Sequence, residues 1–245
     1  QQFGVRLLQR SGRTVKPTIV GTRILERSRD LLRDVRDLYS AASDTRLPAG
    51  PLRLGATPTV LMGLLAHCLR YWNQAHPDVA IYIEPGTSAL LLEKVTAGEL
   101  DAAILVHPSF DLPKSCAWKL MREEPLILLT PVAMEVDDVL AIAASQPFSR
   151  YDRHVVAGRM AYDYLNAKGI SPKVQFELDG IEHIAQLVAE GFGVSGLPAS
   201  PVLRGHDPRV RRCPLPPPCP SRQRGIVWTP GAGRSALASE FVAFA

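Results

Sequence analysis

Strand-like and helix-like segments alternate through most of the chain, and this alternation restricts the possible folds more than any other feature. Residues 52–56, 79–84 and 102–106 are short runs rich in apolar residues, typical of strands. Between them, residues 57–75 and 88–97 carry apolar residues at helical spacing. A strand–helix–strand order of this kind joins parallel strands through right-handed crossovers. The sequence therefore predicts an α/β fold built on a parallel sheet.

The second half of the chain continues the alternation with longer polar intervals. A strand at residues 126–129 opens a second unit, and a polar stretch follows from residue 136. The other predicted elements are strands at 174–178, 194–197 and 226–229 and helices at 158–168, 181–190 and 235–245. A chain of 245 residues, 46% of them hydrophobic, is long enough for one or two cores.

The first 50 residues follow a different pattern. Residues 3–8 are predicted as a short helix-like segment, and the turn residues 11–14 separate two β-compatible stretches, as in a hairpin. A long helix is predicted from Thr18 to about Ser43, and a Pro- and Gly-rich break follows at residues 44–51. The break indicates a linker between two parts of the molecule.

The long helix has a heptad seam. Its members recur at alternating steps of four and three residues: Ile24, Ser28, Leu31, Val35, Leu38 and Ala42. Charged Arg and Asp residues dominate the other positions, which favours pairing with a second helix through Ile24, Leu31, Val35 and Leu38. An amphipathic helix that packs on its own domain is the alternative.

Basic charge is concentrated at the amino-terminal end. Residues 1–36 hold nine Lys or Arg and three acids, whereas the other residues hold 19 bases and 21 acids. This asymmetry is typical of a segment that approaches a polyanion, and a solvated helix face is the alternative. With no apolar run of membrane length, no secretion leader and only four cysteines, we expect a cytoplasmic protein without a membrane partner.

Several motifs resemble those of the LysR family of transcriptional regulators, in the same order and at similar spacing. They are residues 50–55 (GPLRLG), 76–79 (HPDV), 98–104 (GELDAAI) and 187–198 (LVAEGFGVSGLP). Residues 4–21 resemble the end of the family's winged helix-turn-helix. Each motif alone is weak, but five in sequence are a specific signal.

The resemblance implies two Rossmann-like subdomains of type 2 periplasmic-binding-protein architecture. A remnant of the winged helix-turn-helix (1–19) and a linker helix for dimerisation (20–46) would precede an effector domain (51–245). Within it we expect subdomain one at 51–123 plus 224–245 and subdomain two at 124–223. The chain would then cross between subdomains near Glu123–Glu124 and near Arg224.

The resemblance also implies partners. A small-molecule effector would bind between the subdomains of a homodimer or a dimer of dimers, and the intact protein would bind operator DNA. Arg6, Arg10 and Arg13 would contact DNA phosphates. Because most of the recognition helix lies outside this sequence, we expect the chain as written to bind DNA poorly. A solute-binding module of a transport system is the alternative function.

Hydroxyl side chains follow two of the predicted strands. Thr57, Pro58 and Thr59 come after strand 52–56, and Thr87 and Ser88 come after strand 79–84. Carboxyl ends of parallel strands meet at one edge of a sheet, where helix N-termini offer free N–H groups. Helix capping alone would also place hydroxyls here. Since the family has effector contacts at matching positions, we expect both roles and a pocket suited to a carboxylate.

The opposite wall of the pocket is expected to come from the second subdomain. Phe148 could stack on a ring, and Arg150 could pair with a carboxylate; a core phenylalanine and a surface arginine are the alternatives. Gly180 and Ile181 begin a helix expected to face the pocket. His107 follows the buried strand 102–106 and would also lie nearby.

The sequence shows no pattern typical of catalysis. The six histidines include no pair at i, i+4 and no cluster at metal-ligand spacing, and neither a nucleophile elbow nor a phosphate-binding glycine loop occurs. We therefore expect no enzyme, metal or cofactor. Cys213 and Cys219 flank a proline-rich segment whose extended form, roughly 19 Å long, opposes a disulfide unless a cis peptide bond folds the segment back.

Overall fold

The structure is a computed structural model that describes residues 3–11, 14–41, 51–203, 207–231 and 235–244. At its amino-terminal end, strands β1 (Leu8–Ser11) and β2 (Thr14–Pro17) form an antiparallel hairpin at the predicted turn. The segment before the hairpin is not helical, contrary to the prediction. Gly4 has a φ of 64° in a turn, and so short a segment cannot sustain a helix by itself.

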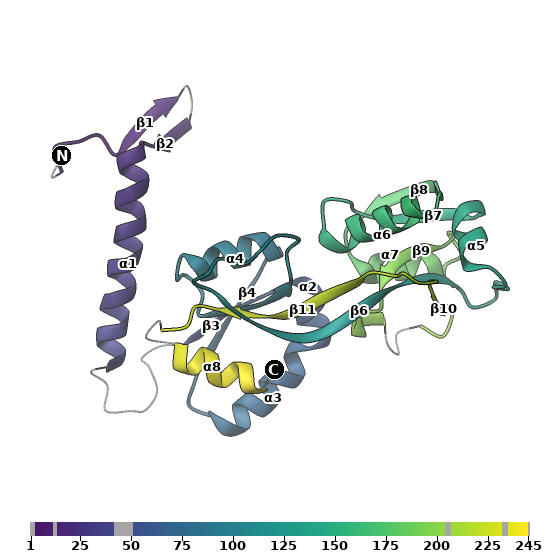
Figure 1. Cartoon of the computed structure of the whole chain (residues 1–245). Helices are drawn as coiled ribbons and strands as arrows, with labels where there is room; N and C mark the ends of the chain where they lie inside the picture. The colour runs from purple at the N-terminus through teal and green to yellow at the C-terminus, as the bar shows by residue number, and fades with distance from the viewer. Residues whose placement is uncertain (1–2, 12–13, 42–50, 204–206, 232–234, 245) are drawn as a thin grey trace.

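Helix α1 (Ile19–Ala41) follows the hairpin and matches the predicted long helix. Its first turn is capped by Thr18, whose hydroxyl accepts a hydrogen bond from the Gly21 N–H at 3.0 Å. Gly21 allows the helix to pass close to the hairpin, because a Cβ there would lie 1.8 Å from the Leu7 carbonyl oxygen. Figure 1 shows α1 standing apart from the rest of the molecule. The predicted linker at residues 44–51 lies almost entirely outside the described residues.

The first lobe contains the predicted parallel sheet. Its elements are β3 (Leu52–Ala56), α2 (Pro58–Gly63), α3 (Leu65–Ala75), β4 (Ile81–Pro85), α4 (Ser88–Thr96) and β5 (Ala102–Val106). Strand β3 lies between β4 and β5 and is parallel to both. The helix predicted at residues 57–75 is divided in two at Leu64. Helix α8 (Ser235–Phe244) completes this lobe, and its Phe241 ring lies 5.4 Å from that of Trp72.

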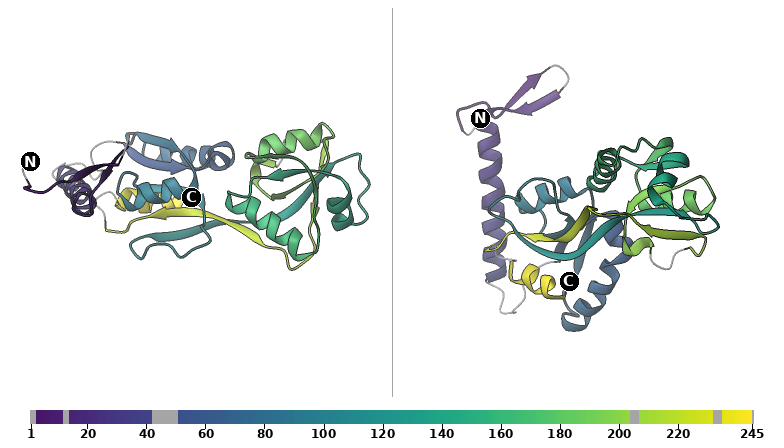
Figure 2. Two further views of the ribbon diagram at one scale, coloured as in Figure 1. Left: turned by 90° about the horizontal axis from the view of Figure 1, so that it is seen from above. Right: turned by 45° about the vertical axis from the view of Figure 1, so that its right-hand side comes forward.

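Two long strands join the first lobe to the second. Strand β6 (Ala117–Pro131) and strand β11 (Ser221–Trp228) are antiparallel partners, and β11 also pairs with β5. Seen from above, both strands run between two separate lobes (Figure 2). The prediction covered only residues 126–129 of β6, because charged side chains interrupt the apolar pattern before Pro125. The subdomain boundaries proposed from the sequence stay a prediction.

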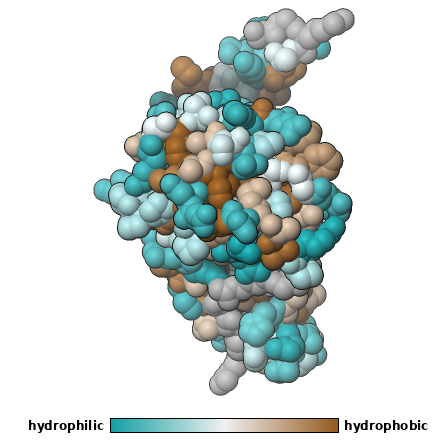
Figure 3. Space-filling model, turned by 90° about the vertical axis from the view of Figure 1, so that its right-hand side faces the viewer, coloured by the Kyte–Doolittle hydropathy of each residue, from teal (hydrophilic) through white to brown (hydrophobic). Residues whose placement is uncertain are grey.

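The second lobe is built on the far half of β6. It contains α5 (Val139–Ser145), β7 (Pro147–Tyr151), α6 (Val156–Ala167), β8 (Lys173–Leu178), α7 (Ile181–Ala189), β9 (Ser195–Pro198), the short helix η1 (Pro201–Leu203) and β10 (Val210–Pro214). Strands β9 and β10 pair with β6, and β7 pairs with β8. The stretch predicted as polar therefore holds α5 and β7. Seen from this end, the surface mixes hydrophilic side chains with small apolar patches (Figure 3).

Each lobe has its own hydrophobic core. Leu54, Trp72 and Phe241 belong to the core of the first lobe, and Leu128 and Val194 to that of the second. Cys213 and Cys219 are both free thiols, and burial raises the pKa of Cys219. No helix in the described part of the chain is both long and apolar enough to span a membrane. The predicted α/β fold class is confirmed.

Candidate functional site

A cleft of about 850 Å³ lies between the two lobes and is lined by residues from both. Its size is within the range of small-molecule sites in proteins. One wall comes from the turns after β3 and β4. The other comes from the ends of β7 and β8 and the helices that follow them, and Arg222 of β11 lies between the walls. The carboxyl ends of parallel strands thus meet at the cleft from both sides.

Thr57 lies on the first wall, directly before helix α2, but does not cap that helix. Its backbone is extended at the N-cap of α2, but its hydroxyl makes no capping hydrogen bond. The side chain is buried, with 6% of its surface exposed, and its hydroxyl has no hydrogen-bond partner among the described residues. Pro58 occupies the first turn of α2, and Thr59 is also buried; both line the cleft. Capping alone therefore does not account for Thr57.

The hydroxyls after β4 are hydrogen-bonded and also line the cleft. Thr87 caps α4, accepting a hydrogen bond from the Leu90 N–H at 3.3 Å. The Ser88 hydroxyl accepts one from the Val106 N–H at 3.2 Å, which ties α4 to β5. Capping and cleft lining therefore coincide at Thr87, as expected from the sequence. The predicted contact of these hydroxyls with an effector remains a prediction.

A buried charged cluster lies behind the cleft, on the two joining strands. Glu124 of β6 accepts hydrogen bonds from Arg222 and Arg224 of β11. Arg224 also donates to the Ser200 hydroxyl at 3.2 Å. Glu124 and Arg224 are fully buried, and Arg222 is 2% exposed while still lining the cleft. Two guanidinium groups therefore share one carboxylate, which leaves one positive charge in excess.

Burial weakens the basicity of both arginines. It lowers the pKa of Arg224 to about 10, with repulsion from Arg122 adding to the effect. It also lowers the pKa of Arg222, against the attraction of the nearby Tyr151. Arg224 remains protonated at neutral pH because its pKa lies well above 7. Because guanidinium groups stay protonated in proteins at neutral pH, the cluster keeps its excess positive charge.

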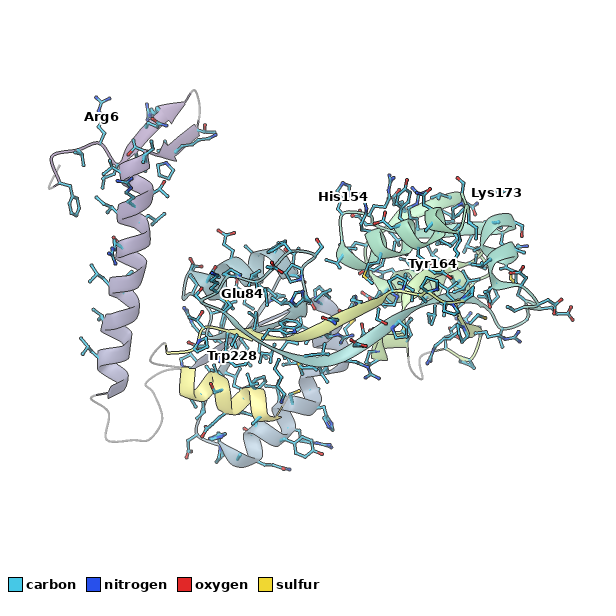
Figure 4. The ribbon with its side chains drawn as sticks, viewed as in Figure 1. Arg6, Glu84, His154, Tyr164, Lys173 and Trp228 are labelled. Carbon is cyan, nitrogen blue, oxygen red and sulfur yellow. The ribbon has the colours of Figure 1, made fainter. Side chains whose placement is uncertain are left out.

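The second wall is richer in acids. Asp152 accepts hydrogen bonds from the backbone N–H and the ring of His154, which lower its pKa. Figure 4 shows His154 on the margin of the second lobe that faces the first. Asp179 and Glu182 line the cleft at the start of α7. Tyr151 is buried at the end of β7, and burial raises its pKa to about 12.

Several residues predicted for this wall lie outside the cleft. Ile181 is fully buried in the second lobe, since it begins α7 on the core side. Phe148 belongs to the core with 3% exposure, and Arg150 pairs with Glu177 at 3.4 Å. Both line a separate cavity of about 80 Å³. Of the residues predicted here, Gly180 lines the cleft, where its φ of 106° turns the chain into α7.

His107 also lies away from the cleft. Its ring packs edge-on against Trp118 with centroids 4.9 Å apart, and its Nδ1 is 2.7 Å from the Pro108 carbonyl oxygen. Its backbone N–H donates to the Gln223 carbonyl, since β5 is bordered by β11. His107 therefore packs where β5 meets the joining strands β6 and β11.

The residues predicted for DNA contact and dimerisation are all in the amino-terminal part. Arg6 and Arg10 are exposed beside or within the hairpin, and Arg13 lies outside the described residues. In α1, Ile24 is half-buried, and the other predicted dimerisation residues are exposed: Leu31, Val35 and Leu38. Sequence reasoning missed Tyr151, Glu182 and Arg222 as cleft residues. The position of Tyr151 at a strand end was the one local signal that could have revealed it.

Two α/β lobes joined by a pair of crossing strands, with a cleft between them, define a ligand-binding protein of the periplasmic-binding-protein type. The LysR substrate binding domain family matches residues 45–245, most of the chain. The chain therefore belongs to the LysR family of transcriptional regulators, as the motifs indicated. It is not a solute-binding module of a transport system.

Named relatives agree with this assignment. The chain is 29% identical to the hydrogen peroxide-inducible genes activator of Pectobacterium carotovorum, over 94% of this chain and 78% of the relative. It is 32% identical to YnfL, an uncharacterised HTH-type transcriptional regulator of Escherichia coli K12, over 82% of this chain and 69% of the relative. Full-length OxyR from Pseudomonas aeruginosa, solved as a point variant, shares the fold, with a TM-score of 0.69, 24% identity and coverage of 99% and 80%.

Proposed function

We propose that this LysR-type regulator senses a small carboxylate that binds in the cleft between its lobes. The observation that carries the proposal is the buried cluster of Arg222, Arg224 and Glu124, which has one positive charge in excess. Arg222 is the member of this cluster that lines the cleft. A buried charge is favourable only when it is compensated, and an anionic effector would compensate it.

The first wall supplies neutral donors for the same anion. The Thr57 hydroxyl is buried beside the cleft and has no partner within the described chain. Ser88 and Thr87 lie at the start of α4, whose positive end favours an anion. Buried polar groups in native proteins are nearly always hydrogen-bonded, so a carboxylate oxygen is a fitting partner for Thr57.

An effector held by both walls would favour one arrangement of the lobes over others. The two joining strands are the described connections between the lobes, so they are the elements that would bend. A ligand shifts such an equilibrium only if it binds the two arrangements differently. Contact with both walls provides that difference.

The amino-terminal part would transmit the change to DNA. Leu31, Val35 and Leu38 expose between 46% and 69% of their surface on α1, which suits pairing in a homodimer or a dimer of dimers. Arg6 and Arg10 would approach operator phosphates in the intact protein. The protein would act in the cytoplasm as a regulator, without enzymatic activity.

Some relatives are named for a response to hydrogen peroxide, which raises thiol oxidation as a second function. All four cysteines of this chain are in the described part, and none of them lines the cleft. Cys68 and Cys213 are buried, and burial raises the pKa of Cys68, which lowers its reactivity. Effector binding in the cleft is therefore the better-supported function.

Calorimetric titration with pentanoate tests the proposal on the wild type and on Thr57→Val. Losing a hydrogen bond to a charged ligand costs about 1.5–3 kcal/mol, so the affinity should fall at least about tenfold. Thr96→Val is the matched control, because Thr96 is on α4 but does not line the cleft. Equal binding of pentanoate to wild type and Thr57→Val would contradict the proposed site.

A further inference from the structure

The two walls of the cleft differ in charge. The lining residues of the first lobe are hydroxyl-bearing, small or apolar, and none is ionisable. The second lobe contributes three carboxylates to the lining: Asp152, Asp179 and Glu182. The cleft lining therefore holds one arginine, between the walls, and three carboxylates on the second wall. A simple carboxylate would complement only half of this pattern.

Glu182 is the acid of this wall that lacks a donor. Asp152 accepts hydrogen bonds from His154, and Asp179 accepts one from the Gly180 N–H at 2.8 Å. The Oε2 atom of Glu182 is buried and has no hydrogen-bond partner in the described residues. Its Oε1 atom lies 3.8 Å from His183 Nδ1, within ion-pair distance of a protonated ring but beyond hydrogen-bond distance.

Glu182 lies at the amino-terminal end of a helix. It is in the first turn of α7, whose positive end stabilises a carboxylate. The helix end alone does not satisfy the buried oxygen, because an ionised oxygen without a hydrogen-bond donor is costly to bury. The group that would complete this site is therefore a cationic donor that reaches it from the cleft.

We propose that the effector is an amino acid, with its ammonium group on Glu182 and its carboxylate on Thr57 and Arg222. This inference rests on the proposed function and adds the ammonium group to it. The unpartnered Glu182 oxygen and the unpartnered Thr57 hydroxyl line opposite walls, so one zwitterion would satisfy both. Apolar residues such as Val106 and Val155 also line the cleft and suit an aliphatic chain.

Compounds with the same five-carbon chain test each charge separately. The probes are L-norvaline, 5-aminopentanoate, pentanoate and pentylamine, titrated by calorimetry into the full chain at neutral pH. We expect at least one of the two amino acids to bind about tenfold or more tightly than pentanoate, because only it gains a charge-assisted hydrogen bond to Glu182. Pentylamine should bind more weakly than the better amino acid, since it has no carboxylate for Thr57 and Arg222.

Glu182→Gln should abolish the preference for the amino acid over pentanoate and leave pentanoate binding within about twofold. Glu190→Gln is the matched control, because Glu190 follows the other end of α7 and pairs with Arg209 outside the cleft. Glu182→Asp keeps the charge and should retain part of the preference. Thermal unfolding of each variant shows that it is folded before titration.

The outcomes separate the two proposals. If pentanoate binds as tightly as both amino acids, or if Glu182→Gln keeps the preference, the zwitterion is rejected. In that case, pentanoate binding that is weakened by Thr57→Val still supports the carboxylate site. If none of the four compounds binds the wild type, both proposals are rejected.

Discussion

Arg222 and Glu124 face each other on the two strands that join the lobes, and the Arg222 Nε donates a hydrogen bond to Glu124 Oε2 at 2.8 Å. Arg224 donates to the other oxygen of the same carboxylate. Glu124 thus holds two arginines from one strand, one lining the cleft and one buried beneath it. Its carboxylate is therefore the counter-charge shared by both arginines.

Glu124→Gln should destabilise the protein strongly, because it leaves two buried guanidinium groups without their counter-charge. Breaking a buried ion pair costs about 3–5 kcal/mol. Urea unfolding followed by circular dichroism measures the change. Glu123→Gln is the control, since Glu123 is the exposed neighbour on β6 and should change stability by less than about 0.5 kcal/mol. Similar values for both variants would show that the buried cluster does not stabilise the fold.

Tyr151 should make the protein less stable at alkaline pH. Its folded pKa is raised by burial to about 12, above its ordinary value of about 10. The neutral hydroxyl is therefore favoured in the folded state, and its contribution is present below pH 10 and lost as the pH rises towards 12. Between about pH 9 and about pH 11 this amounts to about 1 kcal/mol.

The measurement compares the unfolding free energy of the wild type and Tyr151→Phe at those two pH values. Between the lower and the higher pH, the unfolding free energy of Tyr151→Phe should fall by about 1 kcal/mol less than that of the wild type. Tyr162→Phe, at a more exposed position, should lose as much as the wild type. If Tyr151→Phe loses as much unfolding free energy as the wild type between the two pH values, burial does not raise the pKa of Tyr151.

Gly193 should be far less replaceable than Gly191, although both have positive φ. A Cβ on Gly193 would lie 2.0 Å from the Pro147 carbonyl oxygen, which accepts a hydrogen bond from the Val194 N–H. A Cβ on Gly191 would have no heavy atom within 4 Å. We expect Gly191→Ala to cost about 1 kcal/mol and Gly193→Ala more than about 3 kcal/mol, measured by urea unfolding. Equal losses of unfolding free energy in the two variants would mean that the positive φ, and not the close contact with Pro147, sets the cost of the substitution.

Leu31→Glu should disrupt pairing through α1. Leu31 is a member of the heptad seam and exposes 63% of its surface, so a charge there would be buried against a partner helix. The dissociation constant of the dimer, measured by analytical ultracentrifugation, should rise at least about tenfold. Thr22→Glu places the same side chain on α1 outside the seam and should leave the assembly unchanged. A dimer that tolerates Leu31→Glu equally well would pair through another surface.

The sequence predicted the first lobe better than the second. Strands β3 and β5 and helices α1 and α4 were found because apolar periodicity is a local property of consecutive residues. The first half of β6 was missed because charged residues interrupt its apolar pattern, and the arginines that bury Glu124 lie on β11, about 100 positions away. Helix α5 and strand β7 were missed because the segment from residue 136 was predicted to be polar, although residues 139–144 of α5 are all apolar.

The sequence by itself determined the family, the fold class and the hydroxyl-rich wall, since each depends on short motifs whose spacing is fixed along the chain. The tertiary structure decided the rest of the other wall, of which the sequence indicated only Gly180. It placed Tyr151 and Glu182 on the cleft and put Phe148 in the core. It also brought Arg222 between the walls from the other end of the chain. A side chain's chemistry is local, but the partners that bury or expose it are set by contacts across distant segments.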